Sequence, residues 1–295
     1  MALLLSEALL TPDNEFGKPD LFYDIGDEFH ERFAKSQGRP DIDACIQAYD
    51  QALNLLSADD DRLIQISNDA GGAYSERYRR FGAIDDINQA IIKWELALPV
   101  MSEYDPMAPS LLNDLGCSFL SRFQQAGNFD DLEESIRLHE KAVELTPEGD
   151  PELPVSLNNL ANSFSSRFQQ TGDHSDLLQS VELQQRVVAL TPEDHPNFSS
   201  RLNNLGASFS SLFEQTGDLN DLSQSIQLQQ QAVGLASDES PDLPAWLNNL
   251  GNSFSRRFER TGSLDDLEQD AALEDLVEQE RQKLEALDAK VRSCP

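Results

Sequence analysis

The stretch AWLNNLGNSFSRRFERTGSLDDL, residues 245–267, contains a short motif that returns along the chain at a fixed interval. LNNL begins at residues 157, 202 and 247, and the related LNDL begins at residue 112, so that each start lies 45 residues after the one before. Self-similarity at one such period is the signature of stacked structural repeats, each of which packs only against its neighbours. The sequence therefore predicts a repeat protein.

An aromatic residue marks the same position in each repeat and extends the array beyond the LNNL motifs. The column consists of Phe29, Tyr74, Phe119, Phe164, Phe209 and Phe254. It indicates six repeats. Within one of them, Leu157, Leu160, Phe164 and Phe168 fall at i, i+3, i+7 and i+11, which is the apolar stripe of an amphipathic helix. We call this predicted helix "helix A".

Glycine, proline and short polar residues divide each repeat into two helices. Gly172 supplies the left-handed residue that ends helix A, and glycine returns in its column at residues 82, 127, 217 and 262. A second helix, "helix B", is predicted to begin at a capping column. That column consists of Asp85, Asp130, Ser175, Asn220 and Asp265. Pro154, like the prolines at 19, 109 and 244, suits the first turn of the next helix A.

Two antiparallel helices per repeat predict an all-α fold, a right-handed α-solenoid of helix pairs. Two columns of small residues fit this packing, because they let neighbouring helices approach closely. They are Gly26, Gly71, Gly116, Ala161, Gly206 and Gly251 in helix A, and Cys45, Ala90, Ser135, Ser180 and Ser225 in helix B. Cys45 is thus interpreted as a small core residue. We expect a partial repeat and linker at residues 1–18, six repeats over 19–269 and a capping helix over 270–295.

The pattern resembles that of tetratricopeptide repeats. The matching positions are Leu157, Leu160, Ala161 and Phe164 in helix A and Ser180, Val187 and Pro192 in helix B. The chain departs from the family at Gln184, where an aromatic residue is expected, and in repeat length, since the common unit has about 34 residues. The lengthened form resembles the repeats of kinesin light chain. It is also similar to fungal tetratricopeptide arrays that often precede a caspase-like CHAT peptidase domain.

Two polar columns follow the first leucine of each motif. The first is Asn68, Asn113, Asn158, Asn203 and Asn248, with Tyr23 in the first repeat, and the second is Asp24, Asp69, Asp114, Asn159, Asn204 and Asn249. Asn162 lies at i+4 from Asn158 and shares its face, away from the apolar stripe. The resemblance implies that this face lines a concave groove. Carboxamides both donate and accept, so a ladder of them can pair with the backbone of an extended peptide.

The predicted peptide-binding residues are Asn68, Asn113, Asn158, Asn203, Asn248, Asn162 and Asn252. An alternative role for the first column is an internal ladder that holds the repeats together. For the second column, hydrogen bonding between repeats is the favoured role, since buried polar groups need partners.

Two charged columns have a structural interpretation. Arg32, Arg77, Arg122, Arg167 and Arg257 lie near the end of helix A, with Leu212 as the exception, and Asp41, Asp86, Asp131, Asp176, Asp221 and Asp266 lie at the start of helix B. A cation complements the C-terminal end of a helix dipole and an anion the N-terminal end, and the two columns can form ion pairs. Neither column is interpreted as catalytic.

The composition limits which classes of partner and which cellular compartment are expected for the protein. The net charge of −31 and the sequence pI near 4.2 exclude nucleic acid and anionic membranes as expected direct partners, because both need a basic footprint. A protein or peptide, neutral or basic, suits the charge better. Three scattered cysteines indicate a reducing compartment, and we expect a cytoplasmic protein. No phosphate loop or metal-binding spacing is found, so we expect no enzyme activity, no cofactor and no metal.

The function predicted from the sequence is a scaffold or adaptor that binds a peptide segment on the concave helix A face. Two alternatives stay open. The chain is the regulatory part of a CHAT-type, caspase-like protease system, or it is a truncated remnant that binds nothing. The charged segment at 270–295 is expected to fold over the last repeat as a cap, with dimerisation through a short coiled coil as the alternative.

Overall fold

The computed structural model describes residues 17–102, 104–237, 240–266, 268–269 and 273, and every regular element in these ranges is an α-helix. The chain divides into two compact halves, residues 1–150 and 151–295. The N-terminal half contains α2 (Lys18–Ser36), α3 (Arg39–Asn54), α4 (Leu63–Phe81), α5 (Ile84–Ala97), α6 (Ala108–Ala126) and α7 (Phe129–Leu145). The C-terminal half contains α8 (Leu153–Thr171), α9 (His174–Leu190), α10 (Phe198–Thr216), α11 (Leu219–Leu235) and α12 (Leu243–Thr261).

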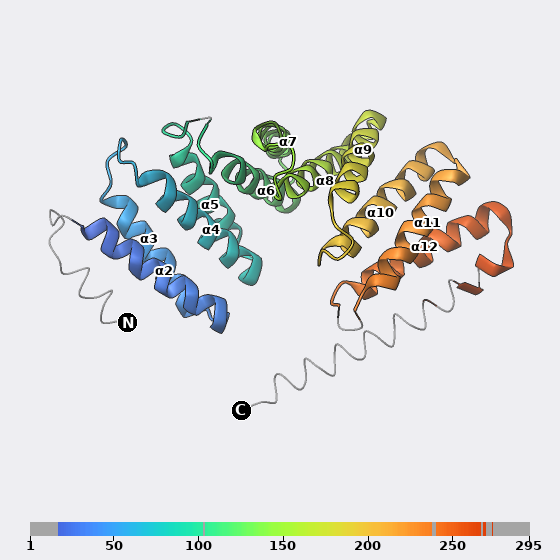
Figure 1. The fold of residues 1–295 in the computed structure, drawn as a ribbon, viewed down its shortest axis with the longest axis horizontal. Helices are drawn as coiled ribbons and strands as arrows, with labels where there is room; N and C mark the ends of the chain where they lie inside the picture. The colour runs from blue at the N-terminus through green and yellow to red at the C-terminus, as the bar shows by residue number, and fades with distance from the viewer. Residues whose placement is uncertain (1–16, 103, 238–239, 267, 270–272, 274–295) are drawn as a thin grey trace, which may run out of the picture. The chain divides into compact units, whose positions relative to one another are not determined.

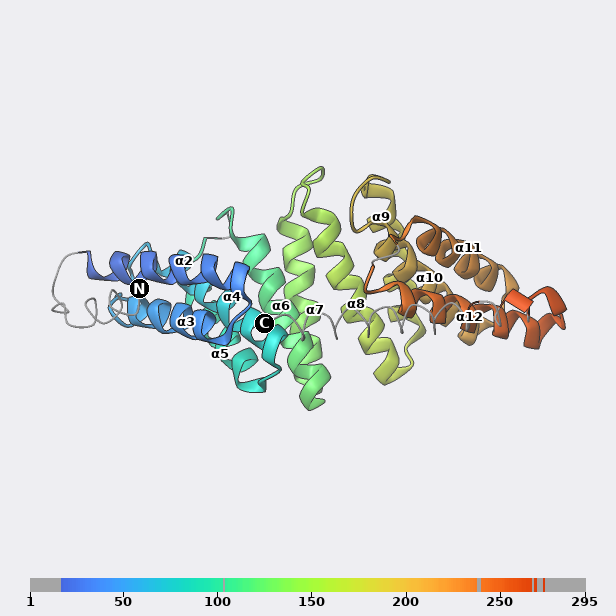
Figure 2. The same ribbon diagram turned by 90° about the horizontal axis from the view of Figure 1, so that it is seen from below.

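Within each half, helix A packs against the helix B that follows it, and that helix B packs against the next helix A (Figure 1). Figure 2 shows the same pairing from a second side, with α2 lying along α3. The even-numbered helices are the A helices, and they begin at residues 18, 63, 108, 153, 198 and 243, each 45 residues after the last. The expected all-α solenoid of helix pairs is confirmed as the fold.

Glycine ends helix A as predicted, but helix B begins earlier than predicted. Gly82, Gly127, Gly172, Gly217 and Gly262 each have φ between 70° and 76°. The caps of helix B are Asn128, Asp173 and Asp218, whose side chains accept from the backbone N–H two residues on. The prediction that the column of Ser175 caps helix B is therefore wrong. The Ser175 N–H instead donates to the side chain of Asp173, which is the cap. Proline does occupy the first turn of α2, α6, α8 and α12.

The column of small residues in helix A receives a large side chain from helix B. A Cβ added at Gly26 would lie 2.4 Å from the Tyr49 ring, and one at Gly71 would lie 2.5 Å from the Trp94 ring. Gly116 faces His139 in the same way, at 2.6 Å. Gly206 faces Gln229 instead of a ring, and a Cβ added there would lie 2.8 Å from the Gln229 side chain. Contact this close leaves no room for a methyl group, so glycine at these positions accompanies a large helix B side chain, whether or not it is aromatic.

The arginine and aspartate columns form an ion pair in each repeat that has the arginine, and Leu212 leaves the fifth repeat without it. Arg77, Arg122, Arg167 and Arg257 contact Asp86, Asp131, Asp176 and Asp266 at 2.6–2.7 Å. Each guanidinium also lies over the aromatic ring three residues before it, 5.0–5.4 Å from the ring centre. The aspartates are at most 5% exposed. The pair therefore joins the end of helix A to the start of helix B inside the repeat, and the predicted structural role is confirmed.

Two further predictions concern the core and the ends of the chain. Cys45 is fully buried, as expected of a small core residue, and burial raises the pKa of its thiol to about 12. The partial repeat expected at residues 1–18 and the capping or dimerising helix at 270–295 fall almost entirely outside the described residues. Among the helices that the structure describes, none is long and apolar enough to cross a membrane.

Two adjacent glycines in α4 give a paired test of the ring packing. Gly71→Ala drives a methyl group into Trp94, and we expect a loss of about 1–3 kcal/mol of unfolding free energy from overpacking. A Cβ at Gly72 meets nothing within 4 Å, so Gly72→Ala should gain about 0.5–1 kcal/mol from helix propensity. Urea denaturation followed by circular dichroism measures both variants, and equal effects would contradict the packing account.

The ion pair between helix A and helix B can be tested with a residue that the chain itself uses. Arg167→Leu copies Leu212 and leaves Asp176, which is 2% exposed, without its cation. We expect a loss of about 3 kcal/mol, because a buried charge without a partner is costly. The control is Arg137→Leu, which breaks an exposed pair with Glu134 and should cost less than about 1 kcal/mol. A similar cost for both changes in urea denaturation would refute a buried role.

Candidate binding face of the A helices

The predicted asparagines differ in how accessible they are. Asn113 and Asn203 are 8% and 6% exposed, so their side chains lie largely within the fold. Asn68, Asn158 and Asn162 are half-buried, and Asn248 and Asn252 are exposed. The asparagines therefore do not form a uniform ladder at the surface, and Asn248 and Asn252 are the most accessible of them.

Hydrogen bonds join the first polar column of one repeat to the second polar column of the next. The Tyr23 hydroxyl donates to the Asp69 carboxylate at 2.8 Å, and Asn249 donates to the Asn203 carbonyl oxygen at 3.3 Å. The expected role of the second column between repeats is therefore observed at these two positions. Asn203 takes part as well, so at that position the first column contributes to the internal ladder.

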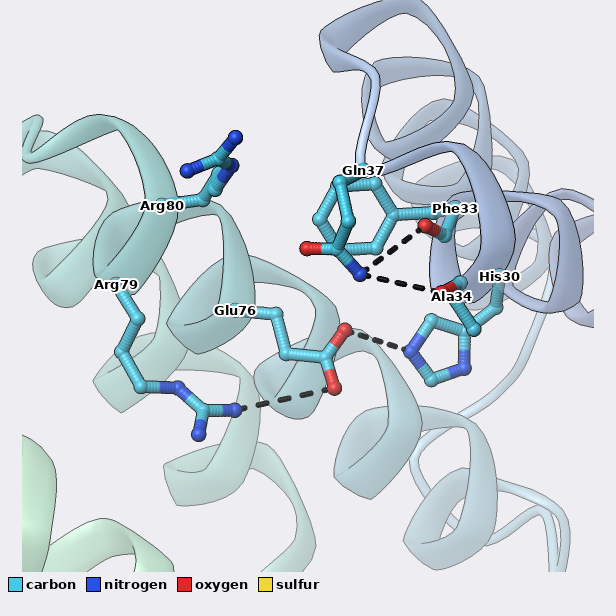
Figure 3. Close-up of a pocket in the computed structure, with 7 residues that line it drawn as sticks. All are labelled: His30, Phe33, Ala34, Gln37, Glu76, Arg79 and Arg80. Carbon is cyan, nitrogen blue, oxygen red and sulfur yellow. Dashed lines mark hydrogen bonds and ion pairs between the residues drawn. The ribbon is translucent and has the colours of Figure 1, made fainter. Parts of the chain in front are cut away.

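A hollow lies between α2 and α4, and we call it the His30 hollow. It has a volume of about 390 Å³ and is lined by His30, Phe33, Ala34, Gln37, Glu76, Arg79 and Arg80. Figure 3 shows His30 of α2 pointing at Glu76 of α4, with Nε2 2.8 Å from a carboxylate oxygen. Arg79 reaches the same carboxylate at 3.8 Å. An apolar wall from Phe33 and a polar bridge across two A helices thus meet in one hollow.

A second hollow lies between α4 and α6, and we call it the Gly72 hollow. It has a volume of about 400 Å³. Gly72, Ser75, Glu76 and Arg79 line it from α4, Trp94 of α5 contributes to its lining, and Asp114, Cys117, Ser118 and Ser121 line it from α6. Glu76 and Arg79 belong to both hollows. In the N-terminal half, therefore, two neighbouring hollows open on the A helices.

The C-terminal half repeats this arrangement at matching positions. The Ala207 hollow, about 160 Å³, is lined by Ala207, Ser210, Ser211 and Glu214 of α10, Gln229 of α11, and Asn249, Asn252 and Arg256 of α12. Each of these residues lies three repeats after a position that lines the Gly72 hollow. A further hollow of about 320 Å³ includes Phe213, Gly217 and Arg260, and lies four repeats after the His30 hollow. Each hollow of the N-terminal half thus has an equivalent hollow in the C-terminal half.

Charge and burial set the protonation of the groups in the N-terminal hollows. The hydrogen bond to Glu76 raises the pKa of His30, and the same bond lowers the pKa of Glu76. The Cys117 thiol lies 3.6 Å from Nε2 of His139. Burial raises the pKa of Cys117 to about 12 and lowers that of His139 to about 4. Both groups are therefore neutral near pH 7, and Cys117 is a thiol rather than an activated thiolate.

Sequence reasoning found part of this face and missed its hollows. Cys117, Asn162 and Asn252 share one column with Gly72 and Ala207, and the two smallest members of that column mark two of the hollows. That change of residue size was visible in the sequence. Trp94 and Gln229 were missed, because the groove was expected to be lined by helix A. Within the described residues no group of three or more His, Cys, Asp or Glu side chains is placed to hold a metal ion.

The bridge between α2 and α4 should depend on pH. Because the pKa of His30 is raised in the fold, the stabilisation that it provides is complete below its unfolded pKa of about 6.5 and is lost as the pH rises through the higher folded value. Glu76→Gln should return the pKa of His30 toward 6.5. An NMR titration of the His30 ring protons measures this, and an unchanged pKa in the variant would refute the bridge.

Comparisons with known proteins agree with this architecture. Residues 155–197, which include most of α8 and all of α9, match the family model described as tetratricopeptide repeat. No curated protein matches the sequence.

Solved structures share the fold at low sequence identity. A putative kinesin light chain from Podosopora anserina, with nearly identical TPR-like repeats, is 17% identical with a TM-score of 0.51, over 72% of this chain and 94% of that one. BtubC (BKLC) from P. vanneervenii is 15% identical with a TM-score of 0.51, over 96% of this chain and 92% of that one. Residues 155–197 thus match the tetratricopeptide repeat model, and the chain has the TPR-like helical fold of these solved structures.

Proposed function

We propose that the protein is an interaction scaffold that binds an extended polypeptide segment along the A helices. Solenoids of this type expose long surfaces suited to binding other proteins. The observation that carries the proposal is the recurrence of hollows between successive A helices, at matching positions in both halves. Hollows that recur with the repeat suit a chain whose side chains also recur at regular intervals.

The accessible asparagines provide the backbone contacts in this proposal. Asn158 and Asn162 are half-buried, and Asn248 and Asn252 are exposed. Each can donate to a peptide carbonyl and accept from a peptide N–H. Asn113 and Asn203 are buried, so their contribution is to hold neighbouring A helices in place. The peptide's own charge is expected to be neutral or basic, since the protein carries 53 acidic against 22 basic residues.

Peptide display tests the proposal. A random library is selected against the wild-type protein, and the enriched peptides are measured against a variant with Asn158→Ala, Asn162→Ala, Asn248→Ala and Asn252→Ala. We expect a shared motif from the wild type and a loss of affinity of about tenfold or more in the variant, because hydrogen bonds to these amides contribute about 1 kcal/mol each.

The matched control removes amides from the B helices instead. Gln185→Ala, Gln230→Ala and Gln231→Ala truncate exposed carboxamides of α9 and α11, and affinity should stay as in the wild type. Circular dichroism confirms that all proteins fold. An enriched motif that binds the asparagine variant equally well, or that depends on the glutamines, would contradict binding at the A helices, and a library that enriches nothing would count against peptide binding itself.

A further inference from the structure

One column of helix A lines the hollows between successive A helices. It consists of Asp27, Gly72, Cys117, Asn162, Ala207 and Asn252. In the first repeat the Tyr49 hydroxyl donates to Asp27 at 2.6 Å, and in the third repeat Cys117 lies 3.6 Å from His139. A helix A side chain thus covers the polar atom of the helix B ring. Gly72 has no side chain to do so, and a Cβ there would meet nothing within 4 Å.

Trp94 is the helix B ring of the repeat that has Gly72. The tryptophan is 2% exposed and lines the Gly72 hollow, and its indole nitrogen has no hydrogen-bond partner among the described residues. An indole N–H is a donor only. A buried donor without an acceptor is costly, and few are left so in folded proteins. A ligand that brings a hydrogen-bond acceptor to the indole N–H of Trp94 would therefore be stabilised in this hollow.

The same feature occurs at the other small member of the column. Gln229 is 1% exposed and lines the Ala207 hollow, and within the part of the chain that the structure describes its Oε1 accepts no hydrogen bond. In the preceding repeat, which has Asn162 in the column, the corresponding Gln184 Oε1 accepts from Ser208 at 2.7 Å. In each half, therefore, a buried polar atom of helix B that has no hydrogen-bond partner among the described residues lies beside a hollow, in a repeat with a small residue in this column of helix A.

We infer that the Gly72 hollow is a binding subsite for a carboxamide side chain, asparagine or glutamine, of the bound peptide. The inference rests on the proposed peptide binding and names one residue class that it selects. The carboxamide oxygen accepts from the Trp94 indole N–H. Its NH₂ group donates to the acceptors on the walls, among them the hydroxyls of Ser75 and Ser118 and the carboxylate of Asp114.

The charges around the hollow favour a neutral occupant. Arg79 brings one positive charge, whereas Glu76 and Asp114 bring negative charge to the same walls. A carboxylate side chain would accept from Trp94 but would face these acids, and an ammonium group has no acceptor to offer the indole. An aliphatic side chain of the same shape would leave the indole donor without a partner, as it is in the empty hollow.

The chain supplies two matched substitutions for the test. Gly72→Ala copies Ala207, a position that still leaves a hollow, so the site should persist. Gly72→Asn copies Asn162 and places a carboxamide of the protein itself above Trp94, so the site should be filled. The second variant should fold at least as stably as the wild type, because its side chain enters open space.

NMR of the ¹⁵N-labelled full chain measures the site directly. The protein has two tryptophans, and Trp94→Phe assigns their indole signals. The probe is blocked asparagine, N-acetyl-asparagine N-methylamide, with a dissociation constant expected on the order of 1 mM from its size. The Trp94 indole proton should shift downfield and saturate, and the Trp246 signal should stay in place. The shift should remain in Gly72→Ala and vanish in Gly72→Asn.

Blocked leucine, which has the same branching, and blocked aspartate are the comparison probes. The inference is overturned if blocked asparagine gives no saturable shift, if either comparison probe shifts Trp94 as much, or if Gly72→Asn responds like the wild type. Peptide display separates this failure from failure of the proposed function. A motif that depends on the asparagines but is unchanged by Gly72→Asn would leave the scaffold in place and remove only the carboxamide subsite.

Discussion

The close approach of helix A to helix B within each repeat is the constraint on which the other features depend. A glycine or alanine in helix A lets a large side chain of helix B lie directly beneath it, as Gly71 does for Trp94. That side chain then reaches the space between successive A helices. Its polar atom is partnered there by Asp27 in the first repeat and, at Gln184, by Ser208 of the following helix A. Core packing and the chemistry of the candidate binding face therefore depend on the same helix B side chains.

Most of the fold could be predicted from the period of the repeat in the sequence. Helix ends were predictable from Gly172 and its column, because a left-handed residue after helix A admits few alternatives. The roles of Arg167 and Asp176 were also predictable, since charges that recur in step have recurring partners. The start of helix B was missed by two residues, because Asp173 and Ser175 are both good capping residues and only geometry distinguishes them.

The candidate binding face was harder to predict than the fold. A column of identical residues suggested a uniform surface, yet Asn203 is buried against Asn249 whereas Asn248 is exposed. Exposure depends on which side chains the neighbouring repeat brings, and those vary from repeat to repeat. The hollows coincide with the small residues Gly72 and Ala207 of helix A and with the buried side chains of Trp94 and Gln229 of helix B. The small residues can be read from the pattern of helix A, but the helix B side chains cannot.

Net charge and local charge play different parts. The arginines of the paired column are used inside the repeats, where each neutralises a buried aspartate. The excess of acidic residues is left for the surface, which favours solubility and disfavours anionic partners. Arg79 and Arg80 are among the exposed arginines, and they lie beside the His30 hollow. Selectivity among peptides would then come from local features of each hollow rather than from the overall charge.

Mapping a peptide selected by display onto the protein would test the central claim most directly. In ¹H–¹⁵N spectra of the full chain, the account predicts that the largest shifts on peptide addition fall on the A helices, above all on residues of α4 and α6 that line the Gly72 hollow. Shifts concentrated on the exposed surfaces of α5, α7, α9 or α11 would contradict it, because they would place the partner on the B helices.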